Sequence, residues 1–164
     1  MGGLKHPDNS LSPTPYSVGQ PSGRQGFLCA VATERDTFMK AKRRFSEDVL
    51  SAINGGKILG IRAGAEPHRF IGIWAVVVEG RVFVRSWSLK PRSWYRTFLK
   101  EPRGTINVEG REIEVRAVRT RSERLKEAID RAYLAKYNTP GSIKYARDMG
   151  SEKSRATTTE LVPL

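Results

Sequence analysis

Aromatic and basic side chains alternate between residues 81 and 103, in the part of the sequence best suited to ligand chemistry. Seven basic residues lie there beside one acidic residue, and large aromatic side chains are spaced among them (Phe83, Trp87, Trp94, Tyr95 and Phe98). Arginine offers a planar fork of donors to a phosphate, and tryptophan or tyrosine offers a face for stacking. A ligand that is flat at one end and phosphorylated at the other suits this combination. Nucleotide-like cofactors and nucleic acids both fit that description.

Two shorter motifs also favour an anion. Tyr95 and Arg96 stand at the start of an expected short helix, where free backbone N–H groups attract negative charge. Near the C-terminus, Arg155 precedes three threonines at residues 157–159, and hydroxyl groups beside a guanidinium can cradle a phosphate. Threonines are also typical of β-strands, so a purely structural interpretation of this tail stays open.

Metal and hydrolytic chemistry find little support in the sequence. The two histidines, His6 and His68, cannot form a metal site by themselves, and the one cysteine, Cys29, is far from His68. The sequence has no glycine-rich phosphate loop and no convincing Ser-His-Asp set. We therefore expect no bound metal, no intrachain disulfide and no hydrolase.

The formal net charge of the 164-residue chain is +12, and residues 1–38 contribute nothing to it. A basic folded domain attracts phosphates, nucleic acid or anionic lipid head groups, although a basic surface without any such role is equally open. No apolar run approaches the length of a membrane helix, and no secretory signal is visible. We expect a cytoplasmic protein that has no membrane partner.

The N-terminal segment differs in composition from the rest of the chain. Residues 1–38 hold four of the nine prolines together with many serines and glycines. Such a composition is typical of an unfolded arm. We expect a disordered arm over residues 1–38 and one folded domain over residues 39–164.

Local signals in residues 39–164 predict the elements that must position the aromatic and basic cluster. Ser46 is a predicted N-cap of a helix that ends at residues 55–56. Strands are predicted over residues 57–62, 69–79, 82–87, 103–108, 111–119 and 156–162, with hairpin turns at residues 79–81 and 109–110. Helices are predicted over residues 93–100 and 122–137, and residues 142–149 are helical or irregular.

Hairpin-joined strands of this kind form an antiparallel sheet. Six strands with few helices favour a small barrel, because closure removes exposed sheet edges. The fold class that we expect is therefore mainly β with flanking helices. No internal repeat is apparent.

The same elements carry a resemblance to a known superfamily. They comprise the strand pair at residues 69–79 and 82–87, the run Pro91-Arg92-Ser93-Trp94-Tyr95 that opens a short helix, and the hairpin at residues 104–118. These features resemble the FMN-binding split-barrel superfamily, above all its deazaflavin-dependent nitroreductase branch and a related uncharacterised bacterial family. The tail Arg155-Ala156-Thr157-Thr158 resembles the ending of that bacterial family. The resemblance covers residues 46–162.

The resemblance implies a six-stranded antiparallel split β-barrel that dimerises, with FMN or a deazaflavin in a groove near the dimer interface. Basic and hydroxyl side chains hold the phosphate in such proteins. The cofactor-binding residues that the resemblance and the motifs point to are Arg62, Arg69, Arg85, Ser86, Trp87, Ser88, Trp94, Tyr95, Arg96, Arg155 and Thr157. Tyr95 is also a candidate proton donor in a flavin-dependent or deazaflavin-dependent oxidoreductase.

Two alternatives remain beside the cofactor hypothesis. A basic β-barrel with interleaved aromatic residues also describes a nucleic-acid-binding protein, whose affinity falls steeply with salt. The nitroreductase branch has a turn rich in Lys and Ser, where this chain has neither at residues 63–68. A dimeric split barrel without a cofactor is therefore the second alternative.

Overall fold

The computed structural model describes residues 44–164, which contain five helices and seven strands. In chain order these are α2 (Glu47–Gly55), β1 (Leu59–Ala63), β2 (Ile71–Ile73), β3 (Ala75–Val78), β4 (Arg81–Val84), α3 (Trp94–Lys100), β5 (Arg103–Val108), β6 (Arg111–Arg119), α4 (Glu123–Lys136), α5 (Ile143–Asp148), α6 (Glu152–Ala156) and β7 (Thr159–Pro163). The arm expected at residues 1–38 lies outside the described residues.

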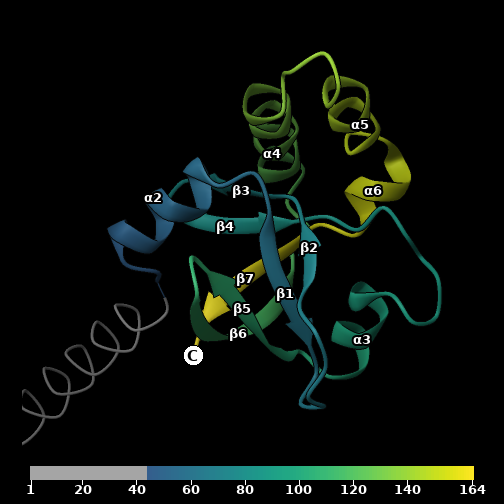
Figure 1. Ribbon diagram of the computed structural model, residues 1–164. Helices are drawn as coiled ribbons and strands as arrows, with labels where there is room; N and C mark the ends of the chain where they lie inside the picture. Colours follow the sequence, from purple (N-terminus) through teal and green to yellow (C-terminus); the bar gives the residue numbers. More distant parts are fainter. Residues whose placement is uncertain (1–43) are drawn as a thin grey trace, which may run out of the picture. The chain divides into compact units, whose positions relative to one another are not determined.

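The seven strands form one antiparallel sheet in the order β2-β1-β5-β6-β7-β4-β3. The two end strands, β2 and β3, follow one another in the chain and are separated only by Trp74. The sheet therefore curls until its two ends meet at this residue, which makes a nearly closed barrel (Figure 1). The expected fold class, a mainly β antiparallel barrel with flanking helices, is confirmed.

The strand count differs from the expectation of six because the predicted strand at residues 69–79 is two strands. The first half, β2, pairs with β1, whereas the second half, β3, pairs with β4. A run of β-branched residues predicts extended backbone but carries no signal for a change of partner. The break at Trp74 lets the chain pass from one end of the sheet to the other.

The two hairpin turns have the geometry that their sequences predict. Glu79 and Gly80 both have positive φ angles, 54° and 68°, and Glu109 and Gly110 have φ angles of 50° and 84°. Positive φ at both central positions is the mark of a type I′ turn, whose twist matches that of the flanking strands. The turns set the registers of β3 against β4 and of β5 against β6.

Serine caps begin two of the predicted helices. The Ser93 hydroxyl accepts the N–H of Arg96 in α3, and the Ser122 hydroxyl accepts the N–H of Leu125 in α4. Residues 142–149, predicted as helical or irregular, contain α5. No helix among residues 44–164 is long and apolar enough to cross a membrane.

The predicted last strand begins three residues too early. Residues 152–156 form α6, and β7 begins at Thr159. The hydroxyls of Thr157 and Thr158 donate back to the carbonyls of Ser154 and Arg155, both at 2.7 Å. Local hydroxyl bonds of this kind compete with strand pairing, so they end a helical turn where threonine content alone predicted a strand.

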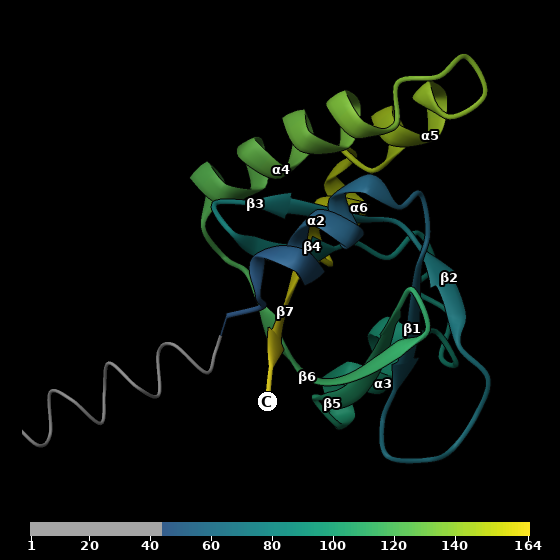
Figure 2. The ribbon, with the colours of Figure 1, turned by 60° about the vertical axis from the view of Figure 1, so that its left-hand side comes forward.

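Helices cover the barrel from several sides. Helix α4 crosses β3 and β4 with α5 and α6 beyond it, whereas α3 lies apart from them, at the other end of the long loop after β4 (Figure 2). Two buried apolar clusters result. One fills the barrel interior, and the other packs Val76 and Phe83 against Leu125, Ile129 and Tyr133 of α4. The loop from β4 to α3 connects the side of the barrel covered by α4, α5 and α6 with the side where α3 lies.

Candidate functional site

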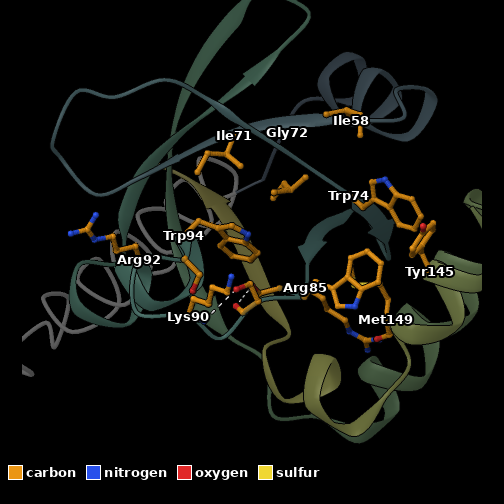
Figure 3. A pocket seen from close by; sticks show the side chains of 15 residues that line it. Ile58, Ile71, Gly72, Trp74, Arg85, Lys90, Arg92, Trp94, Tyr145 and Met149 are labelled. Carbon is orange, nitrogen blue, oxygen red and sulfur yellow. Dashed lines mark hydrogen bonds between the residues drawn. The ribbon is translucent and has the colours of Figure 1, made fainter.

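A cavity of about 600 Å³ lies beside Trp74, the residue between β2 and β3. Its lining comes from four segments: the residue before β1, β2 with Trp74, the chain from Arg85 to Trp94, and α5 with the residue after it. The lining residues are Ile58, Ile71, Gly72, Ile73, Trp74, Arg85, Ser86, Trp87, Ser88, Lys90, Arg92, Ser93, Trp94, Tyr145 and Met149 (Figure 3). Ligand sites in proteins commonly have volumes of about 300–1,000 Å³.

Apolar side chains that are unusually exposed gather at this cavity. Ile58 is 59% exposed, Ile71 is 39% exposed and Trp87 is 46% exposed. Single exposed apolar residues are ordinary on a protein surface, but a group of them around one hollow marks a binding site. Figure 3 shows Trp94 on one side of the cavity and Trp74 with Tyr145 on the other.

Neighbouring aromatic rings hold two of the tryptophans in place. Trp87 meets Tyr145 edge to face, with ring centroids 4.9 Å apart. Trp74 stacks on Tyr137 at 4.0 Å, with the planes 3° from parallel. The Tyr137 hydroxyl in turn accepts the N–H of Ala75 at 3.2 Å, and burial raises its pKa to about 12, so it stays protonated. The aromatic part of the cavity is therefore held by contacts within the protein itself.

The loop at residues 85–93 forms the polar end of the cavity. Ser86 donates its hydroxyl to the carbonyl of Ser88 at 2.7 Å, and the Ser88 hydroxyl accepts the N–H of Lys90 at 3.3 Å. The Ser93 hydroxyl accepts the N–H of Arg96. Within residues 44–164, neither the Ser88 nor the Ser93 hydroxyl donates its proton to another group. Both can therefore donate to a ligand oxygen.

Within the described part of the chain, the charged residues that line the cavity are all positive. Lys90 and Arg92 are exposed, and neither forms an ion pair with another described residue. No Asp or Glu is among the lining residues. A separate hollow of about 310 Å³, the Glu101 hollow, differs in this respect, because Glu101 and Glu114 share it with Arg62 and Arg103. The larger cavity thus favours an anionic group beside Lys90 and Arg92.

Arg85 lines the cavity, but its guanidinium is engaged by the protein. The side chain is buried and forms an ion pair with Asp130. It also donates to the Thr158 hydroxyl at 2.9 Å, and to the carbonyls of Met149 at 2.7 Å and Lys126 at 3.0 Å. These contacts use four of the five N–H donors of a guanidinium. Arg85 therefore ties α4, α5 and the end of α6 to the floor of the cavity.

The motif of Arg155 and the threonines at residues 157–159 supports the cavity from inside the protein. The buried Thr157 hydroxyl accepts the N–H of Ser86 at 2.8 Å and so holds the start of the loop. Arg155 donates to Glu123 at 3.2 Å and lies 3.4 Å from Asp130. Neither Arg155 nor Thr157 is among the residues that line the cavity.

Four more of the expected residues lie away from the cavity. Arg62 pairs with Glu112 at 3.2 Å and lines the Glu101 hollow, and Arg69 is exposed outside both that hollow and the main cavity. Tyr95 is 6% exposed within the barrel core, away from the cavity lining. Arg96 donates to the carbonyl of Leu89 at 3.3 Å and so shapes the loop. The structure thus brings Arg85, Ser86, Trp87, Ser88 and Trp94 together at the cavity and places the other six elsewhere.

Several lining residues were not among the expected site residues. Lys90, Arg92 and Ser93 lie inside the aromatic and basic segment, and Lys90 and Arg92 are two of the seven basic residues counted there. Trp74 lies inside the predicted strand at residues 69–79. Tyr145 belongs to α5 and Met149 directly follows it, and no local pattern connects that helix with Trp87.

The comparisons with known proteins place the chain in a family. Residues 50–161 match the family described as "Uncharacterized protein conserved in bacteria (DUF2255)", and this protein belongs to that family. None of the curated proteins compared with the sequence matches it.

Three solved structures are similar to this chain. A conserved hypothetical protein from Mycobacterium tuberculosis is 14% identical, with a TM-score of 0.50 over 76% of this chain and 82% of its own. A putative pyridoxamine 5'-phosphate oxidase from Listeria innocua is 12% identical, with a TM-score of 0.44 over 72% and 90%. A FAD-binding protein from Mesorhizobium loti is 12% identical, with a TM-score of 0.43 over 73% and 89%. A shared fold follows from the first likeness only.

Proposed function

We propose that this protein binds a flavin-type cofactor, FMN or a deazaflavin, in the 600 Å³ cavity. The observation that supports the proposal is the division of one cavity into an aromatic and aliphatic part and a part with hydroxyls and cations but no acid. Trp87, Trp94 and the β2 wall would hold the flat ring. Ser88, Lys90 and Arg92 would hold the phosphate. These residue types suit a ligand that is flat at one end and anionic at the other.

A bound flavin supplies hydride and electron transfer, which makes an oxidoreductase the matching enzyme class. The lining of the cavity contains no carboxylate, histidine or cysteine. The contribution of the chain is therefore to bind and orient the ring and to neutralise the phosphate. Tyr95 is buried outside the cavity and has no part in this proposal.

A homodimer is part of the same proposal. Strand β2 stands at one end of the sheet and pairs with β1 alone among the described strands. Ile71 on this edge and the adjoining Ile58 are exposed. A second copy that covers this edge would shield both the apolar side chains and the free backbone groups. Light scattering coupled to gel filtration tests the proposal, and a monomer at micromolar concentration would contradict it.

The experiment that tests cofactor binding compares ligands with and without the phosphate. The absorption spectrum of the freshly purified protein is recorded first, and then FMN, riboflavin and a deazaflavin are titrated while ligand fluorescence is followed. A double variant, Lys90→Ala with Arg92→Ala, should weaken FMN binding by about 10-fold or more, because two charge-assisted contacts are lost. Riboflavin, which has no phosphate, should bind the double variant as it binds the wild type.

The matched control is the double variant Arg119→Ala with Arg121→Ala, which removes two exposed cations away from the cavity. It should leave the affinity for FMN unchanged. Absence of binding for all three ligands would overturn the proposal. In that case an oligonucleotide titrated at low salt tests the nucleic-acid alternative, whose affinity must fall steeply as salt rises.

A further inference from the structure

A second, shallow hollow adjoins the polar end of the cavity. It has a volume of about 580 Å³ and is lined by Trp87, Ser88, Leu89, Lys90 and Lys153. Trp87, Ser88 and Lys90 line the main cavity as well. The two hollows are therefore one continuous surface, with the exposed indole of Trp87 between them.

Lys153 reaches this surface from α6, far from the loop in sequence. The Ser151 hydroxyl caps this short helix by accepting the N–H of Ser154 at 3.5 Å. Arg155 pairs with Glu123 and Asp130, so the helix is tied to α4 two residues after Lys153. Lys153 itself is exposed and forms no ion pair with any residue in 44–164.

The charges around the second hollow all have the same sign. Lys90 and Lys153 line it, and no Asp or Glu among residues 44–164 does. Like charges at one hollow repel each other unless an anion lies between them, and a surface lined by one sign of charge concentrates the opposite one. A single phosphate beside Lys90 and Arg92 in the main cavity leaves the Lys153 ammonium without a partner.

We infer that the cofactor carries a second anionic group beyond its first phosphate, and that Lys153 binds this group in the hollow past Trp87. The inference rests on the proposed function. The shared chemistry is an anionic extension of a flavin, and two sources supply it. One is the second phosphate of a flavin dinucleotide, and the other is a side chain of carboxylates on a deazaflavin.

The experiment titrates the full-length protein with two ligand pairs. FMN and FAD differ in the second phosphate with its nucleoside, and a deazaflavin with side-chain carboxylates is compared with the same deazaflavin without them. The variants are Lys153→Gln and Lys153→Glu. The matched control is Lys100→Glu, at an exposed position outside both hollows.

Wild-type protein should bind the longer member of one pair more tightly than the shorter one, and that pair identifies the source. Lys153→Gln should weaken binding of the longer ligand by about 5-fold, the size expected for one exposed ion pair, and Lys153→Glu should weaken it further. The shorter ligand should bind all variants equally, and Lys100→Glu should bind every ligand as the wild type does.

Two results overturn the inference in distinguishable ways. If FMN binds but the Lys153 variants change both members of each pair equally or not at all, the second hollow is no subsite, and the proposed function stands. If none of the four ligands binds the wild type, the proposed function fails, and the inference that rests on it fails as well.

Discussion

Replacement of Arg85 by methionine tests whether this residue is structural or ligand-binding. The sequence predicts a contact with the cofactor, whereas in the structure the guanidinium bonds to Asp130, Thr158 and two backbone carbonyls. Methionine keeps much of the length and volume of the side chain but cannot donate a hydrogen bond. Arg85→Met therefore removes the bonds between the cavity floor and the helices around it without leaving a large void.

The loss of stability expected for Arg85→Met depends on how well Asp130, the remaining member of the ion pair, is still compensated. Removal of one member of a buried ion pair costs about 3–5 kcal/mol, because the other charge is left without compensation. Asp130 is 25% exposed and keeps Arg155 at 3.4 Å, so the low end of that range applies. We expect the free energy of unfolding to fall by about 3 kcal/mol, which corresponds to a melting temperature lower by about 10 °C.

Urea unfolding followed by tryptophan fluorescence measures this loss. The control is Arg131→Met, which removes an exposed arginine of α4 and should change the stability by less than about 0.5 kcal/mol. A loss below about 1 kcal/mol for Arg85→Met would refute the structural role. If the same variant also lost affinity for FMN while it stayed stable, Arg85 would be the cofactor ligand that the sequence predicts.

Three further predictions concern stability. Burial lowers the pKa of Lys136 from 10.5 to about 8, so between about pH 8 and 10 the unfolded chain binds more protons, and stability rises with pH. Lys136→Met should abolish this rise in urea titrations, and an unchanged pH slope would contradict the assignment. A Cβ on Gly104 would lie 2.5 Å from a backbone oxygen of β1, so Gly104→Ala should cost about 2 kcal/mol. Gly141→Ala, with nothing within 4 Å, should cost almost nothing, and equal melting temperatures for the two variants would refute the argument. Tyr137→Phe removes the acceptor of the first N–H of β3, at 3.2 Å, and should cost about 1–2 kcal/mol, so an unchanged melting temperature would be inconsistent with it.

Local chemistry predicted much of the secondary structure. Glu79-Gly80 and Glu109-Gly110 make the expected hairpin turns, since both motifs place residues where positive φ is required. Ser93 caps α3 through a contact three residues away. The prediction of a single strand at residues 69–79 was wrong, because the structure has two strands there. The residue types favour extended backbone equally on both sides of Trp74 and give no sign of the break.

Part of the cavity lining was predicted, because it comes from one short segment of distinctive composition. The segment around Trp87 and Trp94 does line the cavity, since its aromatic and basic composition is a property of one short stretch. The Thr157 hydroxyl, expected to bind a phosphate, is buried and bonds to the backbone of Ser86. Composition shows that a polar group is present but not which neighbour it meets.

The sequence alone determined most of the strands, the two hairpin turns and the serine caps of α3 and α4, together with the stretch of chain that carries the charge and the aromatic rings. These features depend on residues within a few positions of one another. The tertiary structure decided which of those side chains reach a common cavity. Arg85 meets Met149 and Thr158 at sequence separations of 64 and 73, and closure of the barrel brings α5 to Trp87 and α6 to Lys90. Contacts at such separations arise from the packing of the whole fold, and no local pattern encodes them.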